Sequence, residues 1–223
     1  LIISLFFMGL TGGFLVKDLD RPDRFLYVLL RPQWKSWLVR GAYIITVFGG
    51  LVTMKLMGNL FEISMNWVWV IGGIFAILGA VYTAFLFNQA RARDLWQTPI
   101  QSAIHMLVHA TMAGSVVLMI IAPDSSQWMA NILLWGIVAN VIILAKEILM
   151  PHDTPDTKKA IELMTKGYYS KYFWAGIVLG NLTPIVILNT GPSMMLIAGG
   201  LALVGIYLTE FVRIRVPQMI PLS

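Results

Sequence analysis

The chain has 223 residues, of which 58% are hydrophobic and only 12% are charged, with a formal net charge of +5. Soluble globular domains carry about 25% charged residues, so this composition excludes an ordinary soluble globule. The mean hydropathy of +0.77 instead favours a chain whose solvent is mostly lipid. Cysteine is absent, which excludes disulfides, thiolate metal sites and an iron–sulfur cluster held by this chain.

Seven apolar stretches are candidates for membrane spans, because a bilayer core of ~30 Å needs about 20 apolar residues per helix. Leu1 already lies inside an apolar run, so we expect the first stretch to be truncated, with a signal peptide as the alternative for residues 1–16. The sequence therefore predicts an all-α, polytopic transmembrane helical bundle. The predicted spans are Leu1–Val16, Gly41–Leu60, Trp67–Asn88, Ile100–Ala122, Trp128–Met150, Tyr172–Leu188 and Met194–Val212.

The linkers between these spans differ sharply in charge. Seven crossings place the charged linkers on one face of the membrane, and of the 16 lysines and arginines only Lys55 lies away from that face. Taken alone, this bias favours a cytoplasmic position for the charged face. Interfacial helices are expected there, one within Asp18–Arg40 and one within Pro151–Lys171, where Thr154 is a suitable helix cap and Gly167 a suitable stop.

The linker after the first stretch, DLDRPDRFLYVLLRPQWKSW, packs acids, bases and aromatic residues together. Membrane anchoring accounts for the basic and aromatic half, which includes Arg31, Trp34 and Lys35. It does not account for Asp18, Asp20 and Asp23, because carboxylates gain nothing from lipid phosphates. We interpret the acidic half as a paired network at the entrance of a site that takes or releases protons.

His105 and His109 lie four residues apart in one span and therefore point to one helix face. A bis-histidine haem needs ligands from separate helices, and the third histidine lies in a linker, so we expect neither haem nor a metal ion on this chain. Two interpretations stay open. The pair either packs or hydrogen-bonds between helices, or it handles protons and contacts a quinone, as a side chain with a pKa near neutral can.

Other polar residues lie near the charged face. Lys146 and Glu147 are adjacent and point about 100° apart, so we expect one at the membrane surface and the other inside the bundle. Glu147 and Glu210 are candidates for a proton path. Trp96 and Gln97, in QARARDLWQTP, could stack on and hydrogen-bond a planar ligand, and Asn181 with Pro184 could mark a kink or a cavity.

Four segments resemble one family in order along the chain. DLDRPDRF looks like the Asp-Leu-x-Arg-Pro-x-Arg-Phe loop of the NrfD/PsrC family, the polysulfide-reductase-type membrane subunits that include the quinol-oxidising subunits of alternative complex III. RPQWKSWLVRGAYI is similar to the family's entry into the next helix, and RDLWQTP to its Trp-Asn/Gln-x-Pro turn. TEFVRIRVPQMIPLS is similar to the family's closing segment.

The resemblance implies a single NrfD/PsrC-like domain over residues 1–223 that lacks its N-terminal helix, since the family core has eight spans. It implies a quinone/quinol-binding subunit of a respiratory oxidoreductase, using menaquinone or ubiquinone, with no haem or iron–sulfur cluster of its own. It also implies partners: a four-cluster iron–sulfur subunit and, beyond it, a molybdenum- or haem-containing catalytic subunit. Nucleic acid is not expected as a partner.

The resemblance also assigns roles to particular residues. Proton handling is expected of Asp18, Asp20, His105, His109 and Glu147. Quinone contacts are expected of Asp18, Arg21, Arg24, Trp96, Gln97 and His105. Docking of the iron–sulfur subunit is expected of Arg31, Trp34, Lys35, Arg91 and Arg93.

The location implied is the inner membrane of a prokaryote. Family members commonly dock their partner on the periplasmic face, which opposes the positive-inside rule, and a basic docking surface for an acidic subunit would explain the charge there. We favour the periplasmic placement. The alternatives from other classes are a secondary transporter or channel, which would carry inverted repeats and broken helices, and a purely structural membrane anchor.

Overall fold

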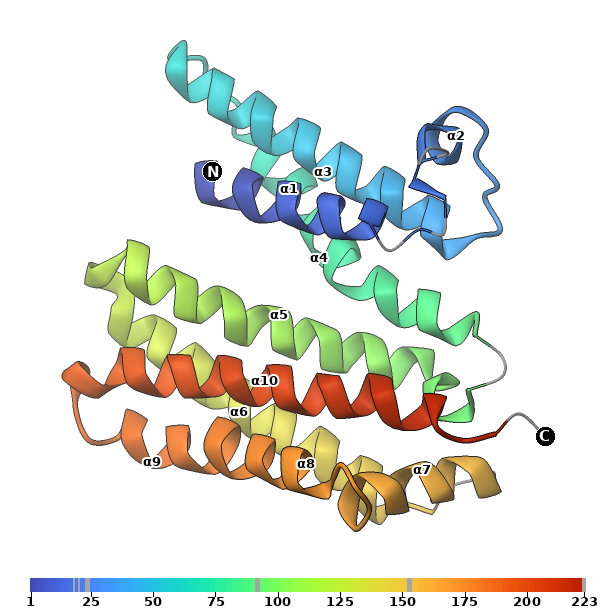
Figure 1. Ribbon diagram of the computed structural model, residues 1–223. Helices are drawn as coiled ribbons and strands as arrows, with labels where there is room; N and C mark the ends of the chain where they lie inside the picture. The colour runs from blue at the N-terminus through green and yellow to red at the C-terminus, as the bar shows by residue number, and fades with distance from the viewer. Residues whose placement is uncertain (18, 20, 23–24, 91–92, 152–153, 222–223) are drawn as a thin grey trace. The chain divides into compact units, whose positions relative to one another are not determined.

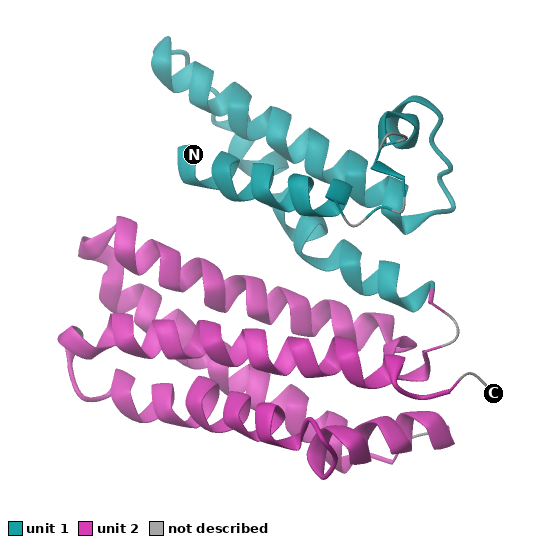
Figure 2. Cartoon of the chain, in the orientation of Figure 1, with its two compact units in different colours: residues 1–89 teal, residues 90–223 magenta. Residues whose placement is uncertain are grey.

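The computed structural model describes residues 1–17, 19, 21–22, 25–90, 93–151 and 154–221 (Figure 1). Within these ranges every regular element is a helix, which confirms the all-α prediction. The chain forms two compact units, residues 1–89 and residues 90–223 (Figure 2).

Among the described residues, six helical segments are long and apolar enough to cross a membrane, one fewer than the seven predicted. The difference is α1 (Ile2–Lys17), whose 16 residues extend about 24 Å at 1.5 Å per residue, short of a bilayer core of about 30 Å. The polytopic bundle itself is confirmed. The six segments are Trp37–Leu60, Trp67–Asn88, Pro99–Ile121, Pro123–Leu149, Ser170–Leu188 and Met195–Gln218.

Unit 1 contains α1, the short α2 (Phe25–Leu30), α3 (Trp37–Leu60) and α4 (Trp67–Asn88). Its helices approach closely where α3 presents glycine: the Tyr82 ring of α4 lies against Gly41, and the Met8 side chain of α1 lies against Gly49. Most large apolar side chains of α4 are exposed, as expected for a helix whose solvent is lipid.

Gln89, which follows α4, hydrogen-bonds to the chain at the start of α3. Its Oε1 accepts a hydrogen bond from the backbone N–H of Trp37 (2.9 Å), and its Nε2 donates to the carbonyl of Lys35 (3.0 Å). The first backbone N–H groups of a helix have no partner within the helix, so Gln89 satisfies one of them at the start of α3.

Unit 2 is a bundle of α5 (Pro99–Ile121), α6 (Ser126–Leu149), α10 (Met195–Gln218) and a broken span. The broken span runs through α8 (Ser170–Ile177), a π-helical turn (Val178–Leu182) and α9 (Thr183–Leu188), and Figure 1 shows it alongside α10. In this π-turn the backbone bond runs over five residues, from the N–H of Thr183 to the carbonyl of Val178. A π-turn therefore interrupts the α-helix at Asn181, where the sequence predicted a kink or a cavity.

The broken span lies very close to α10. A Cβ on Gly180 would overlap the Cα of Gly205, and a Cβ on Gly205 would overlap the Cα of Gly180. One turn away, a Cβ on Gly176 would lie 2.9 Å from Cγ2 of Thr209. Small residues let membrane helices approach at the level of the backbone, and Gly176 and Gly180 have the required four-residue spacing.

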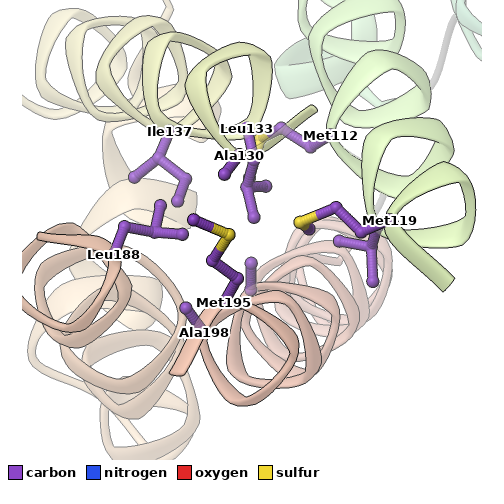
Figure 3. Close-up of a cluster of buried hydrophobic side chains, with 10 residues drawn as sticks. Met112, Met119, Ala130, Leu133, Ile137, Leu188, Met195 and Ala198 are labelled. Carbon is purple, nitrogen blue, oxygen red and sulfur yellow. The ribbon is translucent and has the colours of Figure 1, made fainter. Parts of the chain in front are cut away.

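Two apolar clusters fill unit 2. The first, shown in Figure 3, gathers methionine and aliphatic side chains such as Met112, Ile137, Leu188 and Met195. The second lies toward the other end of the same helices and is made of Leu95, Leu144, Ala160, Ile161, Met164, Phe173, Val212, Val216 and Ile220. Buried Asn140, Asn181 and Thr209 lie between these two clusters along their segments of the bundle.

The predicted interfacial helix in Pro151–Lys171 is confirmed as α7 (Pro155–Thr165). The backbone N–H of Thr157 donates to the Thr154 side chain (3.2 Å), the N-cap bond expected from the sequence. In the linker Asp18–Arg40, the helix among the described residues is the six-residue α2, which the Tyr43 hydroxyl binds through the carbonyl of Leu29 (2.6 Å).

Candidate functional site

A layer of buried polar side chains crosses unit 2, and it begins with the two histidines of α5. His105 is fully buried and His109 is 7% exposed, and their ring centroids lie 4.2 Å apart. Both rings point their Nε2 atoms at one acceptor, Oδ1 of Asn140 in α6, at 2.7 and 3.0 Å. The two histidines thus share one face, as their spacing predicted, and they share one partner.

Asn140 continues the layer to the π-turn. Its Nδ2 donates to Oδ1 of Asn181 (2.8 Å), and Nδ2 of Asn181 donates to the backbone carbonyl of Gly176 (3.1 Å). Each asparagine is 1% exposed. Unpaired polar groups are costly in an apolar interior, and these bonds satisfy both amides.

Arg213 of α10 brings the charges together. Its Nη1 contacts Nδ1 of His105 and lies 3.3 Å from Oε1 of Glu210. Its Nε lies 3.3 Å from Oε1 of Glu147, within ion-pair distance but not aligned for a hydrogen bond. One guanidinium therefore lies between two carboxylates, which offsets the cost of placing ionised groups inside the bundle.

Glu210 closes the layer back onto the histidines. Its Oε1 lies 3.3 Å from Nδ1 of His109, and the same oxygen faces Arg213. Glu147, Arg213, Glu210, His105 and His109 thus form one connected group, which we call the polar network together with Asn140 and Asn181. A network that joins carboxylates, imidazoles and a guanidinium has the chemistry to hold and pass protons.

His105, His109 and Glu210 each offer one atom that could coordinate a metal, and these atoms lie within 4.8 Å of one another. The positive charge at this position is nevertheless supplied by the guanidinium of Arg213, which contacts His105 and Glu210 directly. A second cation there would have to displace Arg213. The donor set therefore fits an internal ion pair better than a metal centre.

A polar cavity of about 300 Å³ leads to Glu147, the acidic end of the polar network. Its lining includes the side chains of Gln97, Gln101, Lys146 and Thr157. A larger hollow of about 770 Å³ lies between α5 and α6, where Trp128, Trp135, Thr111 and Asn131 line it together with aliphatic residues, and no member of the network does. Only the first of these two gives the network an approach from the end of the bundle.

The structure places several predicted residues at this site. His105, His109 and Glu147 belong to the network, and Glu147 is buried while its neighbour Lys146 is exposed, as expected from their angular separation. Trp96 donates from Nε1 to the carbonyl of Arg213 (3.2 Å). Gln97 lines the cavity and donates to the carbonyl of Ala90 (3.2 Å).

Other predicted residues are exposed or lie outside the described residues. Asp18, Asp20, Arg24 and Arg91 are in the latter group. Arg21, Arg31, Trp34 and Lys35 are exposed in unit 1. Arg93 is half-buried, and its Nη1 donates to the carbonyls of Pro217 and Ile220 (2.8 Å each), so it holds the end of α10.

Asn140 and Arg213 were not among the predicted site residues. A signal for each exists in the sequence: Asn140 precedes Glu147 by seven residues and therefore shares its helix face, and Arg213 follows Glu210 by three. Arg213 reads as a basic residue at the end of a span, where membrane anchoring is the ordinary interpretation. Only the packing of three helices reveals that it points inward.

Comparison with known families gives one match, which covers almost the whole chain. The family model described as "Polysulphide reductase, NrfD" matches residues 1–221. No curated protein and no solved structure matches the chain. With six apolar spans in the part of the chain that the structure describes, this integral multi-pass membrane protein therefore belongs to the NrfD polysulphide reductase family. Members of this family are membrane subunits of respiratory oxidoreductases and generally work with iron–sulfur and catalytic subunits.

Proposed function

We propose that this chain is the quinone-reactive subunit of a multi-subunit respiratory oxidoreductase rather than an enzyme by itself. It binds quinone or quinol near its charged face, in the inner membrane of a prokaryote, with that face toward the periplasm. It exchanges electrons with a docked four-cluster iron–sulfur subunit, which connects to a molybdenum- or haem-containing catalytic subunit. The four ordered sequence motifs and membership of the NrfD family support this proposal.

The observation that carries the proposal is the connection between the polar cavity and the polar network. Quinol oxidation releases two electrons and two protons, so a quinone-reactive subunit needs groups that accept protons beside an apolar binding region. Glu147 lines the cavity and lies 3.3 Å from Arg213, which contacts Glu210 and His105. The network thus offers two carboxylates and two imidazoles as proton acceptors, reached from one cavity.

Within this proposal, Gln97 and Trp96 contribute polar and stacking contacts to the quinone headgroup, and Lys146 at the cavity provides a donor for its carbonyl oxygen. The roles implied by the resemblance are part of this proposal: Asp18 and Asp20 handle protons, and Asp18, Arg21 and Arg24 contribute quinone contacts. The exposed side chains Arg31, Trp34 and Lys35, together with Arg91 and Arg93, contribute to the docking surface for the iron–sulfur subunit.

Purification of the full-length protein from its native membrane, after mild solubilisation, tests the partnership. Analysis of co-purified proteins, metals and quinone should find a stoichiometric iron–sulfur partner and bound quinone, and a quinone-site inhibitor should bind. An iron-free chain that catalyses substrate counterflow in vesicles would support the transporter alternative instead. An iron–sulfur partner without inhibitor binding or bound quinone would support a structural anchor.

Glu147→Gln tests the role of the network in turnover. The amide keeps the size of the side chain but accepts no proton, so quinone-linked turnover should fall by roughly 10²-fold, the scale of general acid–base contributions. Glu162→Gln is the matched control, because it makes the same chemical change at an exposed residue of α7 that does not line the cavity. Equal effects of the two substitutions on turnover, measured with a soluble quinone analogue, would contradict the role of Glu147.

A further inference from the structure

A short chain of hydrogen bonds links the backbone of the π-turn to the two histidines. Its links are the Gly176 carbonyl, the Asn181 amide, the Asn140 amide and Nε2 of both His105 and His109, with distances of 3.1, 2.8, 2.7 and 3.0 Å. The four side chains that form these hydrogen bonds are each at least nine-tenths buried, and the backbone of Gly176 packs against Gly205 and Thr209. Water therefore has little access with which to substitute for any of these bonds.

The first link sets the direction of all the others. A backbone carbonyl only accepts hydrogen bonds, so Asn181 must turn its Nδ2 toward Gly176 and its Oδ1 toward Asn140. Asn140 must then donate from Nδ2, which leaves Oδ1 facing the histidines. Reversing either amide would bring two acceptors together at hydrogen-bond distance.

The direction of these hydrogen bonds determines which ring nitrogens of the two imidazoles carry a proton. Both must carry hydrogen on Nε2, because both face the acceptor Oδ1 of Asn140. Nδ1 of His105 faces a guanidinium N–H of Arg213, so it accepts and carries no proton. Nδ1 of His109 faces Oε1 of Glu210 at 3.3 Å, and a hydrogen bond there requires one proton between the two atoms.

We infer that Asn181 and Asn140 are positioning residues, through which the Gly176 carbonyl fixes which ring nitrogens of the two histidines carry a proton. The exchangeable proton of the network lies between His109 and Glu210. His105 is held as the neutral Nε2–H tautomer and serves as an acceptor for Arg213. The tautomers follow from the hydrogen bonds alone, whereas their effect on quinone turnover rests on the proposed function.

The charged groups around His109 support this division. His105 stacks against it from the same helix, Glu210 faces it from α10, and Arg213 binds Glu210 from one turn further on. Glu147 of α6 faces Arg213 rather than His109. Nδ1 of His109 therefore faces a carboxylate oxygen with which it can share a proton, whereas Nδ1 of His105 faces the guanidinium itself.

Nitrogen NMR of histidine-labelled protein tests the inference directly, because protonated and bare ring nitrogens resonate in well-separated ranges. The full-length protein carries His152→Gln and a histidine-free affinity tag, which leaves the two rings of interest from the three histidines of this chain. We expect Nε2–H on both rings, a bare Nδ1 on His105, and a shared-proton signal for Nδ1 of His109. The last signal should shift to that of a bare nitrogen in Glu210→Gln.

Variants at position 181 test the relay itself. Asn181→Leu removes both bonds and should produce a mixture of tautomers at both histidines, whereas Asn181→Asp, as the neutral acid, can donate to Gly176, accept from Asn140 and restore the single tautomer. Asn189→Leu is the matched control, since Asn189 is exposed directly after the same span and its side chain donates to the carbonyl of Ile185, outside the polar network.

Three results would overturn the inference. The first is an Nδ1–H tautomer for His105 in the protein whose network is intact. The second is unchanged tautomers in folded Asn181→Leu, and the third is a His109 signal that does not respond to Glu210→Gln. The first needs no substitution in the network, so it decides even if the leucine variant fails to fold. If folded Asn181→Leu keeps both the single tautomers and normal quinone turnover, the hydrogen-bond relay is overturned while the proposed function stands. The two outcomes can be told apart because tautomers and turnover are measured separately.

Discussion

The two units place charge within their membrane spans in opposite ways. In unit 1, Lys55 of α3 is 7% exposed, and its Nζ lies 5.6 Å from the centroid of the Trp69 ring. No carboxylate among the described residues pairs with it. In unit 2, Arg213 lies between Glu147 and Glu210 and also contacts His105, and His109 faces Glu210.

This difference shows which kind of buried charge is organised for chemistry. A lone lysine near the end of a span can direct its ammonium toward the membrane surface or an aromatic face, and it needs little else from the fold. A layer that combines both signs of charge needs several helices to place their polar side chains at one level. Unit 2 meets that requirement through the close approach of α10 to the broken span.

The largest expected effect comes from breaking this close approach. In Gly205→Val the new side chain would overlap the backbone at Gly180, so we expect destabilisation by more than about 3 kcal/mol and loss of most folded protein. Gly200→Val, at an exposed position of the same helix with open space around it, should be tolerated. Unfolding by detergent titration measures both, and similar stabilities would mean that the helices do not need this contact.

Removing the cation of the network should have the next largest effect. Arg213→Met leaves the carboxylates of Glu147 and Glu210 without their shared partner, so we expect a loss of about 3–5 kcal/mol in the free energy of unfolding. Arg215→Met provides the control, because Arg215 is exposed two residues later. Adding Glu147→Gln to Arg213→Met should recover part of the loss, and a purely additive double variant would contradict the pairing.

Removing the solitary charge of unit 1 should have the smallest effect. In Lys55→Met the apolar stem remains while the ammonium and its contact with Trp69 are lost, so the free energy of unfolding should change by less than about 1 kcal/mol. The same titration applies. A loss as large as that of Arg213→Met would remove the contrast between the units and would point to an anionic partner for Lys55.

Much of the fold follows from local sequence. Span positions follow from runs of apolar residues, and α7 follows from Thr154, Pro155 and Gly167, whose preferences act within one turn. Span number is less secure, because α1 has the composition of a span but not the length. The prediction of one domain over residues 1–223 stays a prediction.

The site was only partly predictable for a different physical reason. His105, His109 and Glu147 stand out because charged or titratable side chains are rare in apolar spans. Asn140 and Arg213 acquire their roles from partners on other helices, and a single helix pattern does not specify which faces meet. The quinone, docking and location predictions, including those for Asp18, Asp20 and Arg91, stay predictions.

The carbonyl of Gly176 has a further consequence for how this protein can change by mutation. The polarity of the amide chain is set by a backbone atom, and no substitution at position 176 deletes that atom. Mutations can therefore break this series of hydrogen bonds only at the two asparagines or by displacing the helix itself. The main chain at Gly176 thus sets where two titratable side chains carry their protons. That arrangement would persist even as the residues that line the cavity change to suit different ligands.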